Sequence, residues 1–101
     1  MKPLERAFQQ GVKRKLDSVP DLYYFVKEAL AIRGIPDIIG CYKGRFFAWE
    51  LKRSRQEAEK TTGRIVLQRY SLGLIRKAGG LGEIVHPDNF QECLDNLLAL
   101  E

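Results

Sequence analysis

The sequence has few of the residues that build disulfide scaffolds, zinc sites and membrane spans. Its 101 residues include two cysteines, one histidine, one methionine and one tryptophan. Cys41 and Cys93 form neither a CxxC pair nor a zinc pattern, so we expect a reduced protein in the cytoplasm of a phage host or a prokaryotic cell. No run of about 18 apolar residues is present, and the first residues lack the apolar core of a secretory signal. We therefore expect neither a membrane-bound nor a secreted protein.

Basic residues are absent from the last fifth of the chain. Residues 1–82 contain all 17 lysines and arginines together with 8 acidic residues, which is a net charge of +9. Residues 83–101 contain 5 acidic residues and no basic one, and the overall charge is only +4. The small overall net charge thus conceals a strongly basic segment over residues 1–82. Such a segment favours a polyanionic partner such as DNA, although many basic surfaces are simply solvated.

Hydrophobic periodicity predicts one α/β domain over residues 1–101, in which helices flank a mixed β-sheet in the order αβββαβα. Lys43 and Gly44 are typical of a tight hairpin turn between two of the strands. The predicted helices cover residues 3–17, 64–78 and 88–100, and the predicted strands cover residues 21–27, 37–42, 45–52 and 83–86. The second helix is expected to bury a face made of Leu67, Tyr70, Ser71, Leu74, Ile75 and Ala78.

The predicted hairpin brings acidic residues together at its open end. Counting outward from the turn, Tyr42 opposes Arg45 and Asp37 opposes Glu50. Lys52 lies on the same strand face as Glu50, because residues two apart in a strand share a face. Two adjacent carboxylates repel each other unless one takes a proton or a cation lies between them, and a hard cation such as Mg²⁺ suits oxygen ligands. The alternative is an ordinary ion pair of Lys52 on the sheet surface.

This spacing resembles a known nuclease motif. Gly34-Ile35-Pro36-Asp37, followed after 12 residues by Glu50-Leu51-Lys52, resembles the PD-(D/E)xK nuclease superfamily. Gln68, on a helix that ends in Ala78-Gly79-Gly80, makes the chain similar to the VRR-Nuc (virus-type replication-repair nuclease) family. Glu5 in the first helix also fits this family and the archaeal-type Holliday junction resolvases. The resemblance covers residues 3–86.

The resemblance implies a restriction-endonuclease-like fold and metal-dependent hydrolysis of phosphodiester bonds in DNA. It implies that Mg²⁺ or Mn²⁺ binds Asp37, Glu50, Glu5 and the backbone carbonyl of Leu51. It also implies that Lys52 acts on the attacking water and that Gln68 completes the catalytic group. The expected substrate is branched DNA, such as Holliday junctions or flaps, and the expected assembly is a homodimer. The rival interpretation is a nuclease-fold protein that binds DNA without cutting it.

Helix geometry supports both outlying residues of the motif. At about 100° per residue, Glu5 lies on the same side as the apolar stripe of Phe8 and Val12, where a lone carboxylate needs a partner. Glu5 is also close enough to the helix start to turn to solvent and favour the helix dipole. Gln68 lies at the edge of the apolar stripe of its helix, as a boundary residue or as a hydrogen-bond donor to the site.

A polar segment over residues 53–63 follows the motif directly and reads as a loop with a short helical piece. Together with the start of the next helix it carries cations suited to holding a phosphate backbone rather than reading bases. The expected DNA contacts are Arg53, Arg55, Lys60, Arg64 and Arg69.

Overall fold

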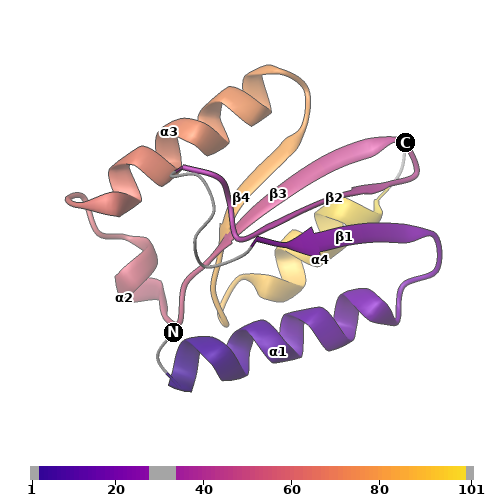
Figure 1. Cartoon of the computed structure of the whole chain (residues 1–101), viewed down its shortest axis with the longest axis horizontal. Coiled ribbons are helices and arrows are strands. Elements are labelled where there is room, and N and C mark those ends of the chain that lie inside the picture. The colour runs from indigo at the N-terminus through magenta and orange to yellow at the C-terminus, as the bar shows by residue number, and fades with distance from the viewer. Residues whose placement is uncertain (1–2, 28–33, 100–101) are drawn as a thin grey trace.

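A computed structural model describes residues 3–27 and 34–99 (Figure 1). The element order confirms the predicted αβββαβα arrangement, with one further short helix, α2, inside the polar segment after the motif. The predicted loop over residues 28–36 lies mostly outside the described residues. The helices are α1 (Pro3–Asp17), α2 (Arg55–Ala58), α3 (Arg64–Lys77) and α4 (Phe90–Leu98), and the strands are β1 (Leu22–Val26), β2 (Ile38–Tyr42), β3 (Arg45–Leu51) and β4 (Leu81–Val85).

The four strands form one mixed sheet in the order β1-β2-β3-β4. The first three strands are antiparallel, and β4 runs parallel to β3. The predicted hairpin register is confirmed, since Tyr42 pairs with Arg45 and Ile38 pairs with Trp49. Lys43 and Gly44 have φ angles of 51° and 83°, as a two-residue hairpin turn with positive φ at both positions requires.

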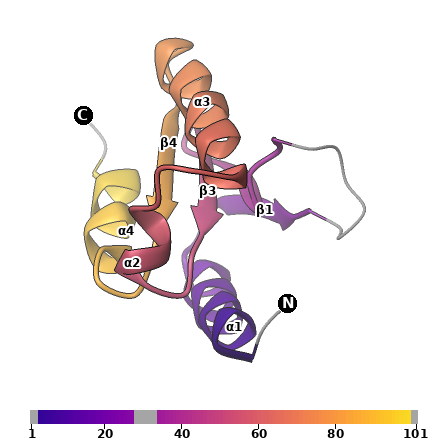
Figure 2. The same ribbon diagram turned by 90° about the vertical axis from the view of Figure 1, so that its left-hand side faces the viewer.

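Helices α1 and α4 cover one face of the sheet and enclose the main hydrophobic core (Figure 2). Phe47 and Trp49 of β3 point into this core and are 0% and 1% exposed. Trp49 meets Phe90 of α4 edge-on, with ring centroids 6.0 Å apart, and Phe90 meets Phe8 of α1 at the same centroid distance. Phe47 and Trp49 thus face away from Glu50 and pack under α1 and α4.

Helix α3 covers the opposite face, over β3 and β4, but with a different side inward from the one predicted. Leu67, Tyr70 and Leu74 are 48%, 64% and 52% exposed, whereas Leu72 is 1% exposed. The physical reason lies in β4, because a Cβ on Gly82 would come within 2.7 Å of the Leu72 carbonyl oxygen. The missing side chain lets the α3 backbone settle directly on the sheet with Leu72 inward.

Within residues 3–27 and 34–99, no helix covers the part of this face over β1 and β2, where Tyr23 and Phe25 are 70% and 48% exposed. Cys41 is exposed there, between the paired residues Tyr23 and Phe46. No helix in the described ranges is long and apolar enough to cross a membrane. We call the exposed apolar side chains of this side the open face, comprising Tyr23, Phe25, Phe46, Leu67, Tyr70 and Leu74.

Candidate active site

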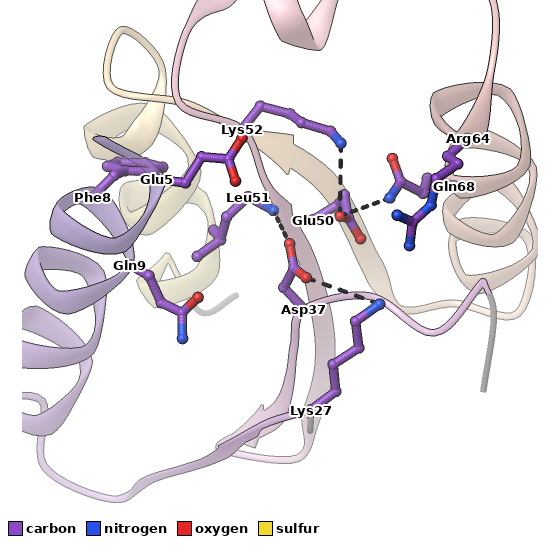
Figure 3. A pocket seen from close by; sticks show the side chains of 10 residues that line it. All are labelled: Glu5, Phe8, Gln9, Lys27, Asp37, Glu50, Leu51, Lys52, Arg64 and Gln68. Carbon is purple, nitrogen blue, oxygen red and sulfur yellow. Dashed lines mark hydrogen bonds and ion pairs between the residues drawn. The ribbon is translucent and has the colours of Figure 1, made fainter. Parts of the chain in front are cut away.

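The motif residues meet in a pocket at one end of the sheet, between α1 and α3 (Figure 3). The pocket has a volume of about 250 Å³. Its lining contains all the residues expected to act in catalysis or metal binding, and it adds Lys27. The residues lining it are Glu5, Phe8, Gln9, Lys27, Asp37, Glu50, Leu51, Lys52, Arg64 and Gln68.

Asp37 is anchored to the neighbouring strand by the backbone. It immediately precedes β2, and its Oδ2 accepts a hydrogen bond of 2.8 Å from the N–H of Leu51. Its Oδ1 lies 3.9 Å from the Nζ of Lys27, and both side chains are 20% exposed. The hairpin register therefore holds one carboxylate oxygen firmly and leaves the other beside a loosely placed ammonium.

Glu50 is buried although it carries an ionisable group, with only 3% of the residue exposed. Its Oε2 accepts a hydrogen bond of 2.9 Å from the Nε2 of Gln68 and lies 4.0 Å from the Nζ of Lys52. Its Oε1 is buried and finds no hydrogen-bond partner within the described part of the chain. A buried oxygen left without a partner costs about 1–3 kcal/mol, so this arrangement is unfavourable unless something else binds there.

The surroundings raise the pKa of Glu50 from 4.5 to about 8. Burial is the largest cause, and the negative charge of Asp37 is the next. Lys52 and Lys27 act in the opposite direction, because their positive charges favour the ionised carboxylate. A further cation between the two acids would restore Glu50 to its charged form at neutral pH.

The donor set fits a hard divalent cation. No group of three or more His, Cys, Asp or Glu side chains converges anywhere in the ranges that the structure describes. The carboxylates of Asp37 and Glu50 nevertheless face one pocket, and the unpartnered Oε1 of Glu50 is a free oxygen donor. Oxygen ligands of this kind suit Mg²⁺ or Mn²⁺, which keep several waters in their coordination shell. Glu5 reaches the same pocket from α1.

Gln68 enters the site because α3 lies on the sheet through an unexpected side. The predicted stripe put Gln68 at its edge, but the inward side of the observed helix carries Ile65, Gln68 and Leu72. The hydrogen bond of Gln68 to Glu50 then links α3 to β3 across the pocket. The motif position was therefore a better guide to this residue than the apolar periodicity.

Most of the cations expected to contact DNA are paired within the protein. The guanidinium of Arg53 donates to Glu57 at 3.1 Å, and Lys60 lies 3.0 Å from the same carboxylate. Arg55 pairs with Glu59 at 3.9 Å. Arg64 is the one of the five that lines the pocket.

Arg69, the last of the five expected DNA contacts, is also occupied within the protein. Its guanidinium donates to the backbone carbonyls of Lys60 and Ala58, and it is half-buried. The reason is that the polar segment folds back along α3 and offers these carbonyls to the helix. Arg69 thereby attaches this segment to α3.

Lys27 was missed by the sequence reasoning. It follows β1, and its backbone N–H donates to the carbonyl of Asp37 at 2.9 Å. The ladder that pairs Val26 with Ile38 thus brings Lys27 opposite Asp37. The only signal in the sequence was the position of a lysine at a strand end, and using it required knowing that β1 pairs with β2.

Comparison with known proteins identifies the fold. No protein-family model matches the sequence, and no curated protein matches it. A solved structure described as "VRR_NUC domain" superposes with a TM-score of 0.68, over 93% of this chain and 94% of that one. The chain has the VRR-Nuc fold. Sequence identity over the match is 16%, so the likeness lies in the arrangement of helices and strands.

The VRR-Nuc fold agrees with the restriction-endonuclease-like architecture expected from the motif. The match covers nearly the whole of both chains. Within that fold, the pocket between α1 and α3 contains the acidic pair and Lys52.

Proposed function

We propose that this chain is a Mg²⁺- or Mn²⁺-dependent deoxyribonuclease that hydrolyses phosphodiester bonds. The observation that carries the proposal is Glu50, a buried carboxylate with a free oxygen, held beside Asp37 and Lys52 in one pocket. A buried acid pair destabilises a fold unless it binds a cation, and the likeness to a VRR-Nuc structure supports nuclease chemistry. The proposed enzyme is a single domain acting in the cytoplasm of a phage-infected or prokaryotic cell.

One group of side chains would hold the metal ion, and Lys52 would act on the attacking water. Asp37, Glu50, Glu5 and the Leu51 carbonyl would hold the cation, which supplies charge stabilisation for the phosphate when bound. The Leu51 N–H fixes one oxygen of Asp37, and Gln68 fixes one oxygen of Glu50, so the remaining oxygens are oriented beforehand.

Lys52 takes the role of the reacting cation. Its Nζ lies 4.0 Å from Glu50, and its side chain is 20% exposed, so it lies beside the acids and is reachable by substrate. An ammonium at this point orients the attacking water and stabilises the negative charge that develops on the phosphorane. The water forms a new P–O bond as the P–O bond to the leaving sugar oxygen breaks, and the proton lost by the water is balanced by the proton that the leaving oxygen takes from solvent.

The assembly that we propose is a homodimer formed through the open face, with branched DNA as substrate. Tyr23 and Tyr70 are 70% and 64% exposed, and large apolar side chains gathered on one side of a small domain favour association. A two-fold dimer carries two identical sites, which suits substrates in which two strands are cut, such as four-way junctions. Sedimentation measures the assembly, and Leu74→Glu is expected to give monomers at concentrations where the unchanged chain is dimeric.

The test of the activity is a cleavage panel. Labelled four-way junctions, flaps and linear duplexes are incubated with Mg²⁺, with Mn²⁺ or with EDTA. We expect metal-dependent cleavage that prefers the branched DNAs and is lost in Asp37→Asn, Glu50→Gln and Lys52→Met. Asp21→Asn is the matched control, because Asp21 is an exposed acid with positive φ in the turn before β1.

Two outcomes contradict the proposal. Full cleavage by Asp37→Asn or Glu50→Gln removes the acid pair from the mechanism. Binding of DNA without cleavage under any divalent metal makes the chain a DNA-binding protein with a nuclease fold.

A further inference from the structure

The pocket contains a second lysine for which the proposed reaction has no role. The Nζ of Lys27 lies 3.9 Å from Asp37, compared with 4.0 Å between Lys52 and Glu50. Figure 3 shows the two lysines approaching the acids from opposite sides. Both side chains are 20% exposed, so Lys27 is as much a part of the pocket as Lys52.

Lys27 is held loosely by Asp37. An N···O distance of 3.9 Å is longer than a hydrogen bond, so the attraction is only that of two charges. Among the described residues, its ammonium donates one hydrogen bond, of 2.7 Å, to the carbonyl of Ile35, a neutral acceptor. An ammonium with one neutral acceptor can still donate to an anion, because it carries three N–H groups.

Arg64 provides a second available cation across the pocket. It begins α3, and its guanidinium makes no hydrogen bond or ion pair with any described residue. Gly63 caps the helix without a side-chain bond, and the first turn contains no acidic residue. The positive end of α3 therefore adds to the charge of Arg64 instead of being neutralised.

These two cations share a second pocket that adjoins the first. It has a volume of about 300 Å³ and is lined by Lys27, Gly34, Arg64, Leu67 and Gln68. Three of these residues, Lys27, Arg64 and Gln68, also line the pocket of the acid pair. An extended ligand bound at the acids can therefore continue past Gln68 into the second pocket.

We propose that this second pocket is a phosphate subsite, in which Lys27 and Arg64 hold the backbone phosphate next to the scissile one. The inference rests on the proposed function and extends it, because every strand cut at the acids carries a neighbouring phosphate. Guanidinium and ammonium groups are the side chains that bind phosphate, and the start of α3 favours an anion. Leu67 lies beside them, 48% exposed, and offers apolar contact to a sugar.

The competing explanation is that Lys27 only neutralises Asp37. Both explanations predict reduced activity for Lys27→Met, so activity alone cannot separate them. The salt dependence of DNA binding separates them. The slope of log affinity against log salt is negative, and each phosphate contact that is lost reduces its magnitude by about 0.7–0.9.

The experiment measures binding of fluorescein-labelled four-way junction by anisotropy, in EDTA, at several salt concentrations. Lys27→Met and Arg64→Gln are each expected to reduce the magnitude of the slope by about 0.7–0.9, and the double variant by about twice that amount. Lys27→Arg is expected to restore the slope, since it keeps the charge. Lys43→Met is the matched control and is expected to leave the slope unchanged, because Lys43 lies in the distal hairpin turn.

A second measurement uses the cleavage reaction. Arg64→Gln is expected to raise KM with kcat nearly unchanged, because the subsite binds substrate and transition state equally. Unchanged slopes in both single variants overturn the subsite, while metal-dependent cleavage by the unchanged chain leaves the nuclease proposal standing. Reduced slopes without any cleavage keep the subsite as a DNA contact and overturn the nuclease instead. Absence of DNA binding overturns both.

Discussion

Trp49 and Glu50 are adjacent in β3 and both buried, yet they point to opposite faces of the sheet. Trp49 belongs to the hydrophobic core, and Glu50 belongs to the candidate site. Trp49 is 1% exposed and packs among the apolar side chains beneath α1 and α4. Glu50 is 3% exposed and has a buried oxygen without a partner. The face of the sheet beneath α1 and α4, here called the covered face, stabilises the fold. The face beneath α3 destabilises it, because a carboxylate is buried there away from water. Burial alone therefore does not tell a core residue from a site residue.

The largest expected effect is a loss of stability from a substitution in the covered face. Trp49→Ala removes the ring that contacts Phe47 and Phe90, and we expect the free energy of unfolding to fall by about 3–5 kcal/mol. Urea denaturation measures this loss. Phe46→Ala, on the open face at 44% exposure, is the matched control and is expected to cost far less. A similar loss in both variants would contradict the division between the two faces.

The second prediction concerns the reacting cation of the α3 face. Lys52→Met is expected to lower kcat by about 10²–10³-fold, the usual effect of removing one group that stabilises transition-state charge. The unfolding free energy is expected to change little, because the side chain is 20% exposed and its ion pair is long. Cleavage kinetics and urea denaturation of the same preparation test both statements. A large loss of stability with normal kcat would make Lys52 a structural residue.

The third prediction uses the raised pKa of Glu50. Its folded pKa of about 8 exceeds its unfolded value of 4.5, so its contribution to stability is fully present below about pH 4.5. That contribution is lost as the pH rises to about 8, because ionisation is easier in the unfolded chain. Glu50→Gln keeps a neutral group at all pH values and is expected to be more stable than the unchanged, metal-free chain at pH 8, by about 1–3 kcal/mol.

Thermal or urea unfolding in EDTA at pH 5 and pH 8 measures this difference. The two chains should differ little at pH 5 and most at pH 8. Added Mg²⁺ should stabilise the unchanged chain at pH 8 and leave Glu50→Gln nearly unaffected, since cation binding needs the ionised acid. An equal pH dependence in both chains would remove Glu50 as its cause.

The smallest expected effect concerns the open face. Leu74→Ala, at 52% exposure, is expected to change the unfolding free energy of the monomer by no more than about 0.5 kcal/mol. Leu72→Ala, two residues earlier and 1% exposed, is expected to cost about 2–5 kcal/mol. Urea denaturation at low protein concentration compares them. Equal costs would place Leu74 in the core and return α3 to the orientation predicted from its periodicity.

The sequence by itself determined the elements and most of the candidate site. Local patterns sufficed for α1, the β2–β3 hairpin and its register, because turn chemistry and alternation act over a few residues. That register already paired Asp37 with Glu50, and motif spacing added Lys52, Glu5 and Gln68.

Only the tertiary structure decided how α3 lies on the sheet and which cations reach the pocket. Helix α3 has apolar residues on more than one side, so its periodicity could not choose between Leu74 and Leu72. The choice came from Gly82, distant in sequence, where the missing side chain admits the helix backbone. Lys27 likewise reached the acids only through the pairing of β1 with β2. Contacts between distant segments depend on shape and packing, which no local pattern encodes.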